Sequence, residues 1–359
     1  MHITFLIGNG FDRNLGLKTT YSDFVKVYKT LKSSSPHIEA FRRHINQNEE
    51  KWSAAEEALG QYTQYLETGQ GEAFSECQGD FCVHLANYLK DQQSRIHFDL
   101  EKENIKTAFT QFSTLTQPFP AEVRFQLDQV YLNHRSEKVY FDFINFNYTY
   151  TLDECLTIVK QMSGLLGSHD YGGNHYVNTV GRICHVHGTV DGEMVFGVND
   201  ESQIAKPDVF DGNELGKSFL IKKETNELQA ENTDSIANNI LQASSIIYIY
   251  GMALGITDKL WWQRICKWLA ENGSRHLIIH QYDMPPKGVF QYPYQQQSLN
   301  RRRKFMQLGD LSEDQWPLVE GRIHITESNI FSGIKDLADS PENLDNAASP
   351  DSTNLVAAR

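Results

Sequence analysis

The stretch of sequence that decides the fold lies near the start of the chain, at His2-Ile3-Thr4-Phe5-Leu6-Ile7-Gly8-Asn9-Gly10-Phe11-Asp12. Its first six residues are mostly β-branched, aromatic or aliphatic, which predicts a buried strand. Gly8 and Gly10 then permit a tight turn with exposed N–H groups, and a helix directly after it would point its positive end at that turn. This pattern predicts a phosphate or pyrophosphate site, although Arg13 replaces the third glycine of the dinucleotide fingerprint. The alternative is that the glycines only turn a strand into a helix.

The composition excludes several classes of protein. The 359 residues exceed one average domain, so we expect one large domain with an insertion, or two domains. A net charge of −13 argues against nucleic-acid binding. Because no apolar stretch reaches about 20 residues and no signal peptide pattern is present, we expect neither membrane association nor secretion. Five cysteines without metal-site spacing predict reduced thiols in a cytoplasmic protein.

Hydrophobic spacing predicts an α/β protein. Apolar residues recur at three- and four-residue intervals, as in helices, in the segments 21–31, 38–45, 52–66, 81–89 and 123–132. Strand-like segments follow at 138–146, 181–186, 193–198, 245–251 and 275–282. The last two flank a helical segment, 258–271, and a strand–helix–strand unit of this kind builds a parallel sheet.

These segments predict a division of the chain. Residues 1–20 and 136–334 are expected to form the α/β nucleotide-binding domain, interrupted after its first βα unit by a large helical insertion of residues 21–135. Residues 335–359 contain almost no large apolar side chain, so we expect a disordered tail.

Polar residues follow the strand predicted at 138–146, in the sequence Asn147-Tyr148-Thr149. In open parallel sheets, ligands bind outside the carboxyl ends of the strands, which makes Asn147 a candidate site residue. The alternative is that Asn147 caps the next helix.

Two histidines lie at the end of another predicted strand. His185 and His187 would share one face of a strand, and such a pair suggests a metal site. No third ligand can be assigned, so we predict no metal. His187, directly before Gly188, is instead the candidate general base. A fourth strand end is the turn from Gly251 to Asp258, and we expect all four turns to meet at one edge of the sheet.

The chain resembles the AbiH family of bacterial abortive-infection proteins from residue 3 to about residue 330. The motifs that carry the resemblance are Gly8-Asn9-Gly10-Phe11-Asp12, Gly16-Leu17, Thr20-Tyr21-Ser22-Asp23-Phe24, Trp52-Ser53-Ala54-Ala55-Glu56, Phe146-Asn147-Tyr148-Thr149, His187-Gly188 and Gly251-x-x-Leu254-Gly255-x-x-Asp258. More distantly, these blocks are similar to the sirtuin-like NAD-consuming domains. The resemblance implies a Rossmann-like, sirtuin-like parallel sheet.

The same resemblance implies roles for individual residues. It gives dinucleotide binding to Gly8, Asn9, Gly10 and Phe11, and catalysis to Asn147 and His187. Further candidates for cofactor binding are Asp12, Gly251 and Asp258. The two aspartates would bind ribose hydroxyls, or instead cap helices.

The chain departs from the sirtuin pattern at three points. Asn9 lies between the two glycines, Thr149 stands where an aspartate is usual, and the four-cysteine zinc module is absent. The absence of that module disfavours a groove for acetyl-lysine peptides. The closer analogy is with the defence enzymes of this class that hydrolyse NAD.

The function predicted from the sequence is therefore an abortive-infection effector that hydrolyses NAD at the nicotinamide–ribose bond and so depletes the cofactor. The alternative is a nucleotide-binding sensor or regulatory module without turnover. The expected partners are NAD or a related nucleotide and a phage-derived trigger, and we expect a homo-oligomer.

Overall fold

The computed structural model describes residues 1–229, 232–287 and 289–339 of the chain. The described residues contain one six-stranded sheet, in the order β5-β2-β1-β6-β7-β8, in which every pairing is parallel. The strands are β1 (His2–Ile7), β2 (Tyr140–Asn145), β5 (Thr179–His185), β6 (Ile246–Tyr250), β7 (His276–His280) and β8 (Ile323–Thr326). Without the separate hairpin of β3 (Ser168–Tyr171) and β4 (Asn174–Val177), the strand order along the chain is 3-2-1-4-5-6, that of the Rossmann fold. The predicted Rossmann-like parallel sheet is confirmed.

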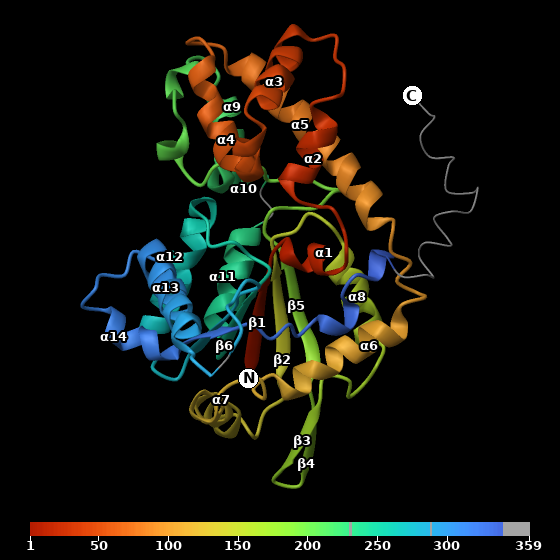
Figure 1. The fold of residues 1–359 in the computed structure, drawn as a ribbon, viewed down its shortest axis with the longest axis vertical. Coiled ribbons are helices and arrows are strands. Elements are labelled where there is room, and N and C mark those ends of the chain that lie inside the picture. The colour runs from red at the N-terminus through yellow and green to blue at the C-terminus, as the bar shows by residue number, and fades with distance from the viewer. Residues whose placement is uncertain (230–231, 288, 340–359) are drawn as a thin grey trace.

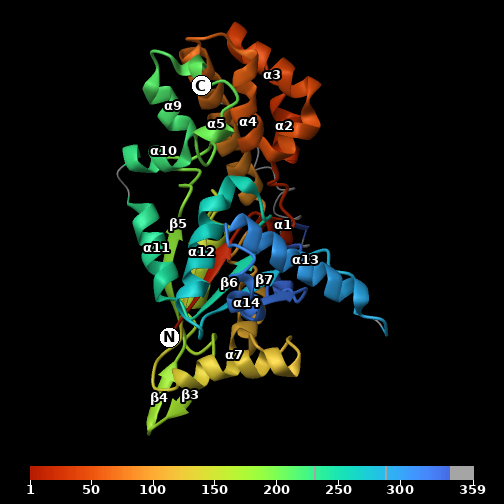
Figure 2. The same ribbon diagram turned by 90° about the vertical axis from the view of Figure 1, so that its left-hand side faces the viewer.

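Helices cover both faces of the sheet (Figure 1). One face is covered by α6 (Lys102–Thr110) and α8 (Thr151–Lys160), and α7 (Ala121–Asn133) packs into the same hydrophobic layer at the end of the sheet (Figure 2). The other is covered by α11 (Thr233–Ala243), α12 (Lys259–Glu271) and α13 (Tyr292–Leu308). Successive side chains of a strand point to opposite faces, so Phe5 packs in the first layer and Leu6 in the second. None of the described helices is both long and apolar enough to cross a membrane.

A helical cap lies over the carboxyl ends of the strands, at the opposite end of the sheet from α7 and the β3–β4 hairpin (Figure 2). Its helices are α2 (Tyr21–Tyr28), α3 (Pro36–Gln47), α4 (Ala55–Tyr62), α5 (Gly71–Gln93), α9 (Glu214–Leu220) and α10 (Lys222–Gln229). The first four correspond to helices predicted from the sequence. Aromatic side chains dominate the core of the cap, where Phe24 and Phe81 are fully buried.

The hydrophobic cores of the structure divide the chain at other positions than the boundaries predicted from the sequence. Within the predicted insertion, residues 21–135, α6 and α7 pack on the sheet and not in the cap. Conversely, the segment between β5 and α11 contributes Val190, Phe196 and Ile221 to the core of the cap. The cap is therefore assembled from two connections of the Rossmann fold.

Two expectations about local structure need correction. The strand predicted at 193–198 is wrong: this segment is irregular, apart from a single bridge between Val198 and Ile221. Its apolar residues fill the cap, where the Phe196 ring stacks on Phe81 at 5.1 Å. In the predicted tail, residues 335–339 pack on the sheet domain, and the Ala338 N–H donates to the Leu15 carbonyl. The remainder of that tail, residues 340–359, lies outside the described residues.

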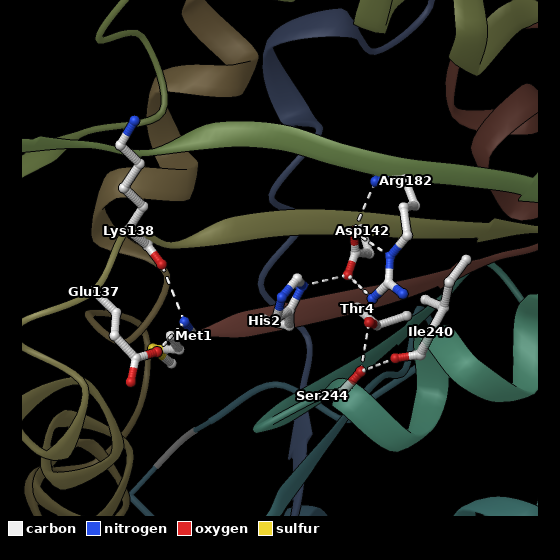
Figure 3. Close-up of polar contacts among 9 residues, drawn as sticks. All are labelled: Met1, His2, Thr4, Glu137, Lys138, Asp142, Arg182, Ile240 and Ser244. Atoms are coloured by element: carbon white, nitrogen blue, oxygen red, sulfur yellow. Dashed lines mark hydrogen bonds and ion pairs between the residues drawn. The ribbon is translucent and has the colours of Figure 1, made fainter.

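The buried carboxylate of Asp142 ties the edge strand β5 to the sheet (Figure 3). Its Oδ1 accepts a hydrogen bond from the Arg182 N–H at 2.7 Å, and Arg182 Nη2 lies 2.9 Å from Oδ2. The ring of His2 on β1 approaches the same carboxylate at 2.7 Å. Gly181 makes room for this arrangement, because a Cβ there would overlap Asp142 Oδ1. A shift in the β2–β5 register accompanies it.

Four neighbouring strands end at the same level. Ile7 of β1 pairs with Asn145 of β2 and with Tyr250 of β6, and Asn145 pairs with His185 of β5. Because parallel strands point their carboxyl ends to one edge, the four turns that follow lie beside one another. The four segments singled out from the sequence are these turns.

The turns after β1 and β6 contact each other through their backbones. The Gly10 N–H donates to the Gly251 carbonyl at 2.8 Å, and a Cβ at Gly10 would overlap the Gly251 backbone. Gly251 itself has a φ of +69°, a conformation that favours glycine. The absence of a side chain at Gly10, which in a dinucleotide turn lets a phosphate approach the backbone, here lets the turn after β6 approach it.

We therefore expect Gly10→Ala to lower the free energy of unfolding by about 1–3 kcal/mol, because the added methyl overpacks the contact with Gly251. The matched control is Gly79→Ala. Gly79 is exposed within α5, and its Cβ would meet nothing within 4 Å, so this change should stabilise the protein by up to about 1 kcal/mol. Denaturant unfolding of both variants measures the difference. Equal stabilities would contradict the role given to Gly10.

Candidate functional site

A pocket of about 500 Å³ lies between the four turns and the cap. Its volume falls within the range of about 300–1,000 Å³ typical of small-molecule sites. The residues singled out from the sequence that line it are Gly8, Asn9, Gly10, Asp12, Asn147, His187, Gly251 and Asp258. The exception is Phe11, which is fully buried with its ring against Phe331 at 5.0 Å. The four turns thus form one continuous wall, and Phe11 belongs to the core behind it.

The glycine turn after β1 has already used part of its hydrogen-bonding capacity. The N–H groups of Gly8 and Gly10 donate to the carbonyls of Tyr250 and Gly251, at 2.9 and 2.8 Å. The Asn9 side chain accepts a hydrogen bond from Thr19 Oγ1 at 2.5 Å and donates to the Thr19 carbonyl at 3.1 Å. Asn9 therefore fixes the loop that leads from this turn into the cap.

Asp12 is buried in the wall of the pocket with both carboxylate oxygens occupied. Thr149 donates to one oxygen at 2.7 Å, and Thr151 donates to the other at 2.5 Å. Burial raises the pKa of Asp12 to about 6, although the two hydroxyl donors oppose this rise. Asp12 lies inside α1 (Gly10–Asn14) and does not cap it. Thr149, a departure from the sirtuin pattern, is thus the partner of Asp12.

Asn147 connects the turn after β2 with the turn after β1. Its Nδ2 donates to the Gly8 carbonyl at 3.2 Å, and its own N–H donates to Asn145 Oδ1 at 3.0 Å. Helix α8 begins at Thr151 with Tyr150 in the capping position. The alternative in which Asn147 caps this helix is therefore wrong.

His187 is the histidine that lines the pocket. The residue is only 7% exposed, and its ring lies 5.3 Å from the Phe146 ring and 6.2 Å from the Tyr148 ring. Burial, assisted by the nearby Lys222 ammonium, lowers the pKa of His187 well below its ordinary value. His187 is therefore neutral at pH 7 and has a ring nitrogen able to accept a proton.

His185 has a different environment, because β5 ends at His185 and the strand alternation does not continue to His187. Its Nε2 lies 2.9 Å from Asp153 Oδ2, and its Nδ1 lies 3.2 Å from the Asn147 carbonyl. Within the described part of the chain, no group of three His, Cys, Asp or Glu side chains is arranged to hold a metal ion.

The cap contributes a second wall, made largely of polar side chains. Glu56 at the start of α4 accepts hydrogen bonds from Tyr21 at 3.2 Å and from Lys222 at 2.7 Å. Lys222 also lies 3.4 Å from Asp258, which directly precedes α12 as its N-cap residue but makes no capping hydrogen bond with its side chain. Lys222 could not be recognised as a site residue from the sequence, because Lys222-Lys223-Glu224 has the composition of an exposed helix.

Comparison with known proteins identifies a family. A family model described as "Bacteriophage abortive infection AbiH" matches residues 4–280. The matched range contains all four turns of the pocket and both parts of the cap. No curated protein and no solved structure matched the chain.

The buried carboxyl of Asp12 predicts a pH dependence of stability. With a pKa of about 6 in the folded protein and 3.8 when exposed, it binds protons more strongly in the folded state. The free energy of unfolding therefore falls as the pH rises from about 4 to about 6. Asp12→Asn lacks this titration, so between about pH 4 and pH 7 the wild type should lose roughly 2 kcal/mol relative to the variant. Denaturant unfolding at several pH values measures this, and a pH-independent difference would contradict it.

Proposed function

The chain belongs to the AbiH family of bacteriophage abortive infection proteins, and we propose that it acts as an enzyme that hydrolyses NAD at the nicotinamide–ribose bond. The observation that carries the proposal is that Asn147 and His187 line one pocket with the turns of β1 and β6. These two turns lie where the strand order reverses, which is where dinucleotides bind in sheets of this order. Depletion of NAD in the cytoplasm, after a phage-derived trigger, would be the means of aborting infection.

The proposed chemistry is a displacement at C1′ of the nicotinamide ribose. The oxygen of a water molecule bonds to C1′ while the bond from C1′ to nicotinamide breaks, and the bonding electron pair leaves with the nicotinamide nitrogen. The transition state has oxocarbenium character, as in glycoside cleavage. His187, neutral at pH 7, accepts the proton of the water. No strong general acid is needed, because nicotinamide leaves as a neutral molecule.

Asn147 is assigned to the water or to a ribose hydroxyl. Its Nδ2 is held by the Gly8 carbonyl, whereas its Oδ1 accepts no hydrogen bond from the residues that the structure describes. An amide oxygen can accept a hydrogen bond from either ligand group. Asn147 would thus orient the reacting group from the sheet side of the pocket.

The pyrophosphate is assigned to the turn after β1. The N–H groups of Gly8 and Gly10 already donate to the carbonyls of Tyr250 and Gly251. The positively charged group assigned to the pyrophosphate is therefore the guanidinium of Arg13, which lines the pocket. A guanidinium is suited to phosphate oxygens by its charge and its paired donors. Asp258 also lines the pocket and would bind ribose hydroxyls.

A sensor that binds a nucleotide without turnover is the second candidate function. The observation that favours it is the environment of Thr149, whose hydroxyl is bonded to Asp12 and is not free to act on a ligand. An assay of NAD consumption by the purified protein, with and without phage lysate, distinguishes the two. Binding without consumption under both conditions would favour the sensor.

If the protein consumes NAD, His187→Ala should lower kcat by about 10²–10⁴-fold, which is typical for the loss of a positioned base, and leave the affinity for NAD nearly unchanged. His185→Ala is the matched control, because His185 lies outside the pocket wall and its loss should cost much less. A rate for His187→Ala close to that of the wild type would contradict the assignment, as would an equal collapse in the control.

The pH profile tests the same base independently. Since the pKa of His187 lies well below 6.5, the neutral base persists on the acid side of its ordinary range. We expect kcat/KM of the wild type to remain near its maximum at pH 6.5 and to fall only at lower pH. A fall centred at pH 6.5 or above would contradict a buried, neutral His187.

A further inference from the structure

The cap and the sheet are joined beside the pocket by one buried ammonium group. Lys222 Nζ donates to Glu56 Oε2 at 2.7 Å and to the Thr257 carbonyl at 3.3 Å, and it lies 3.4 Å from Asp258 Oδ1. Glu56 is the second residue of α4 in the cap, whereas Asp258 is the last residue of the turn after β6. The three charged side chains are only 8–19% exposed. We call Lys222, Glu56 and Asp258 the charged triad.

The charged triad holds two carboxylates and one ammonium, so it carries a net negative charge. Burial raises the pKa of Glu56, but the Lys222 ammonium opposes this rise. Burial alone would lower the pKa of Lys222, yet the carboxylates of Glu56 and Asp258 raise it above its ordinary value. The lysine is therefore charged at pH 7. Each carboxylate oxygen can accept more than one hydrogen bond, so Glu56 has capacity left for a ligand.

The triad lies at the His187 end of the pocket. The Lys222 ammonium lies near enough to His187 to contribute, after burial, to the low pKa of that histidine. Tyr21, which donates to Glu56 Oε1, lies close enough to Tyr148 for their hydroxyls to interact, and the Tyr148 ring is 6.2 Å from His187. Glu56, Asp258, Tyr21 and Tyr148 all line the pocket. Under the proposed function, this is the end that takes the nicotinamide ribose.

We propose that Glu56 is a specificity-determining residue that binds the cationic nicotinamide–ribose end of oxidised NAD, and that Lys222 is the positioning residue that holds Glu56 at the pocket wall. This inference rests on the proposed function. The nicotinamide ring of oxidised NAD carries a positive charge that moves toward ribose C1′ as the bond breaks. A fixed carboxylate at that end stabilises the charge in both states.

Three ligands share the adenosine and pyrophosphate groups but differ at the nicotinamide end. Oxidised NAD carries the cationic nicotinamide ring, NADH carries the reduced, uncharged form of that ring, and ADP-ribose lacks the ring. A carboxylate that recognises the positive charge of the ring contributes to the affinity for oxidised NAD and not to the affinity for the other two ligands. If Glu56 only closed the cap over the pocket, its replacement would weaken all three ligands together.

The experiment measures binding of the three ligands by calorimetry in the His187→Ala background, where turnover is suppressed. We expect Glu56→Gln to weaken binding of oxidised NAD by about tenfold or more, the usual loss for one charge-assisted contact. Binding of NADH and ADP-ribose should stay within about twofold, which also shows that the pocket is intact. Glu227→Gln is the matched control, because Glu227 is an exposed carboxylate that pairs with Lys223 on α10.

Variants at Lys222 test the positioning role. Without the ammonium, a buried Glu56 would take up a proton and lose its charge. Lys222→Met should therefore reproduce the selective loss of oxidised NAD, and Lys222→Arg should largely restore its binding. The matched control, Lys223→Met, changes the exposed neighbour and should have no effect.

The outcomes distinguish this inference from the function on which it rests. Equal weakening of all three ligands in Glu56→Gln, or no weakening of oxidised NAD, overturns the role of Glu56 while nucleotide binding stands. If the His187→Ala protein with Glu56 unchanged binds none of the three ligands, the proposed function is overturned, and this inference is overturned with it.

Discussion

The rest of the structure depends on the backbone contact between the turns after β1 and β6. Gly10 donates to Gly251, and neither turn could approach the other so closely with a side chain at Gly10. This contact lies where the strand order of the sheet reverses. A Rossmann sheet has a crevice at that point of its carboxyl edge, and the contact forms the bottom of the crevice. The neighbouring turns then bring Asn147 and His187 to the same pocket, because all four strands end at one level.

The pocket is also covered by the helical cap, which is formed by two separate connections between strands. The first cap segment follows β1, and the second follows β5, and their apolar side chains form one core. Lys222 is the first residue of α10 in the second segment, and its ammonium contacts both Glu56 of the first segment and Asp258 after β6. One residue thus links three parts of the chain that are far apart in sequence. Loss of that link would change the pocket without disturbing the hydrophobic layers of the sheet.

Burial gives the titratable groups of the pocket their chemical states. The same low exposure that keeps His187 neutral raises the pKa of Asp12 to about 6. The two groups differ in what surrounds them. Asp12 is held by the hydroxyls of Thr149 and Thr151, whereas His187 lies between aromatic rings with an ammonium nearby. Asp12 therefore stabilises the wall of the pocket, whereas His187 is neutral, which is the protonation state that a general base requires.

Apart from β8 and the hairpin of β3 and β4, local patterns in the sequence determined the strands, their parallel arrangement and the residues that follow each strand end, because periodicity and glycine turns act over a few neighbouring residues. They therefore predicted Asn147, His187 and the glycine turns as neighbours. Tertiary structure alone decided that Gly10 contacts Gly251, that Thr149 binds Asp12, and that residues 193–198 fill the cap and do not extend the sheet. It also placed Lys222 beside Glu56, 166 residues away in the chain. Contacts of this kind depend on which distant surfaces are buried together, and no local pattern contains that information.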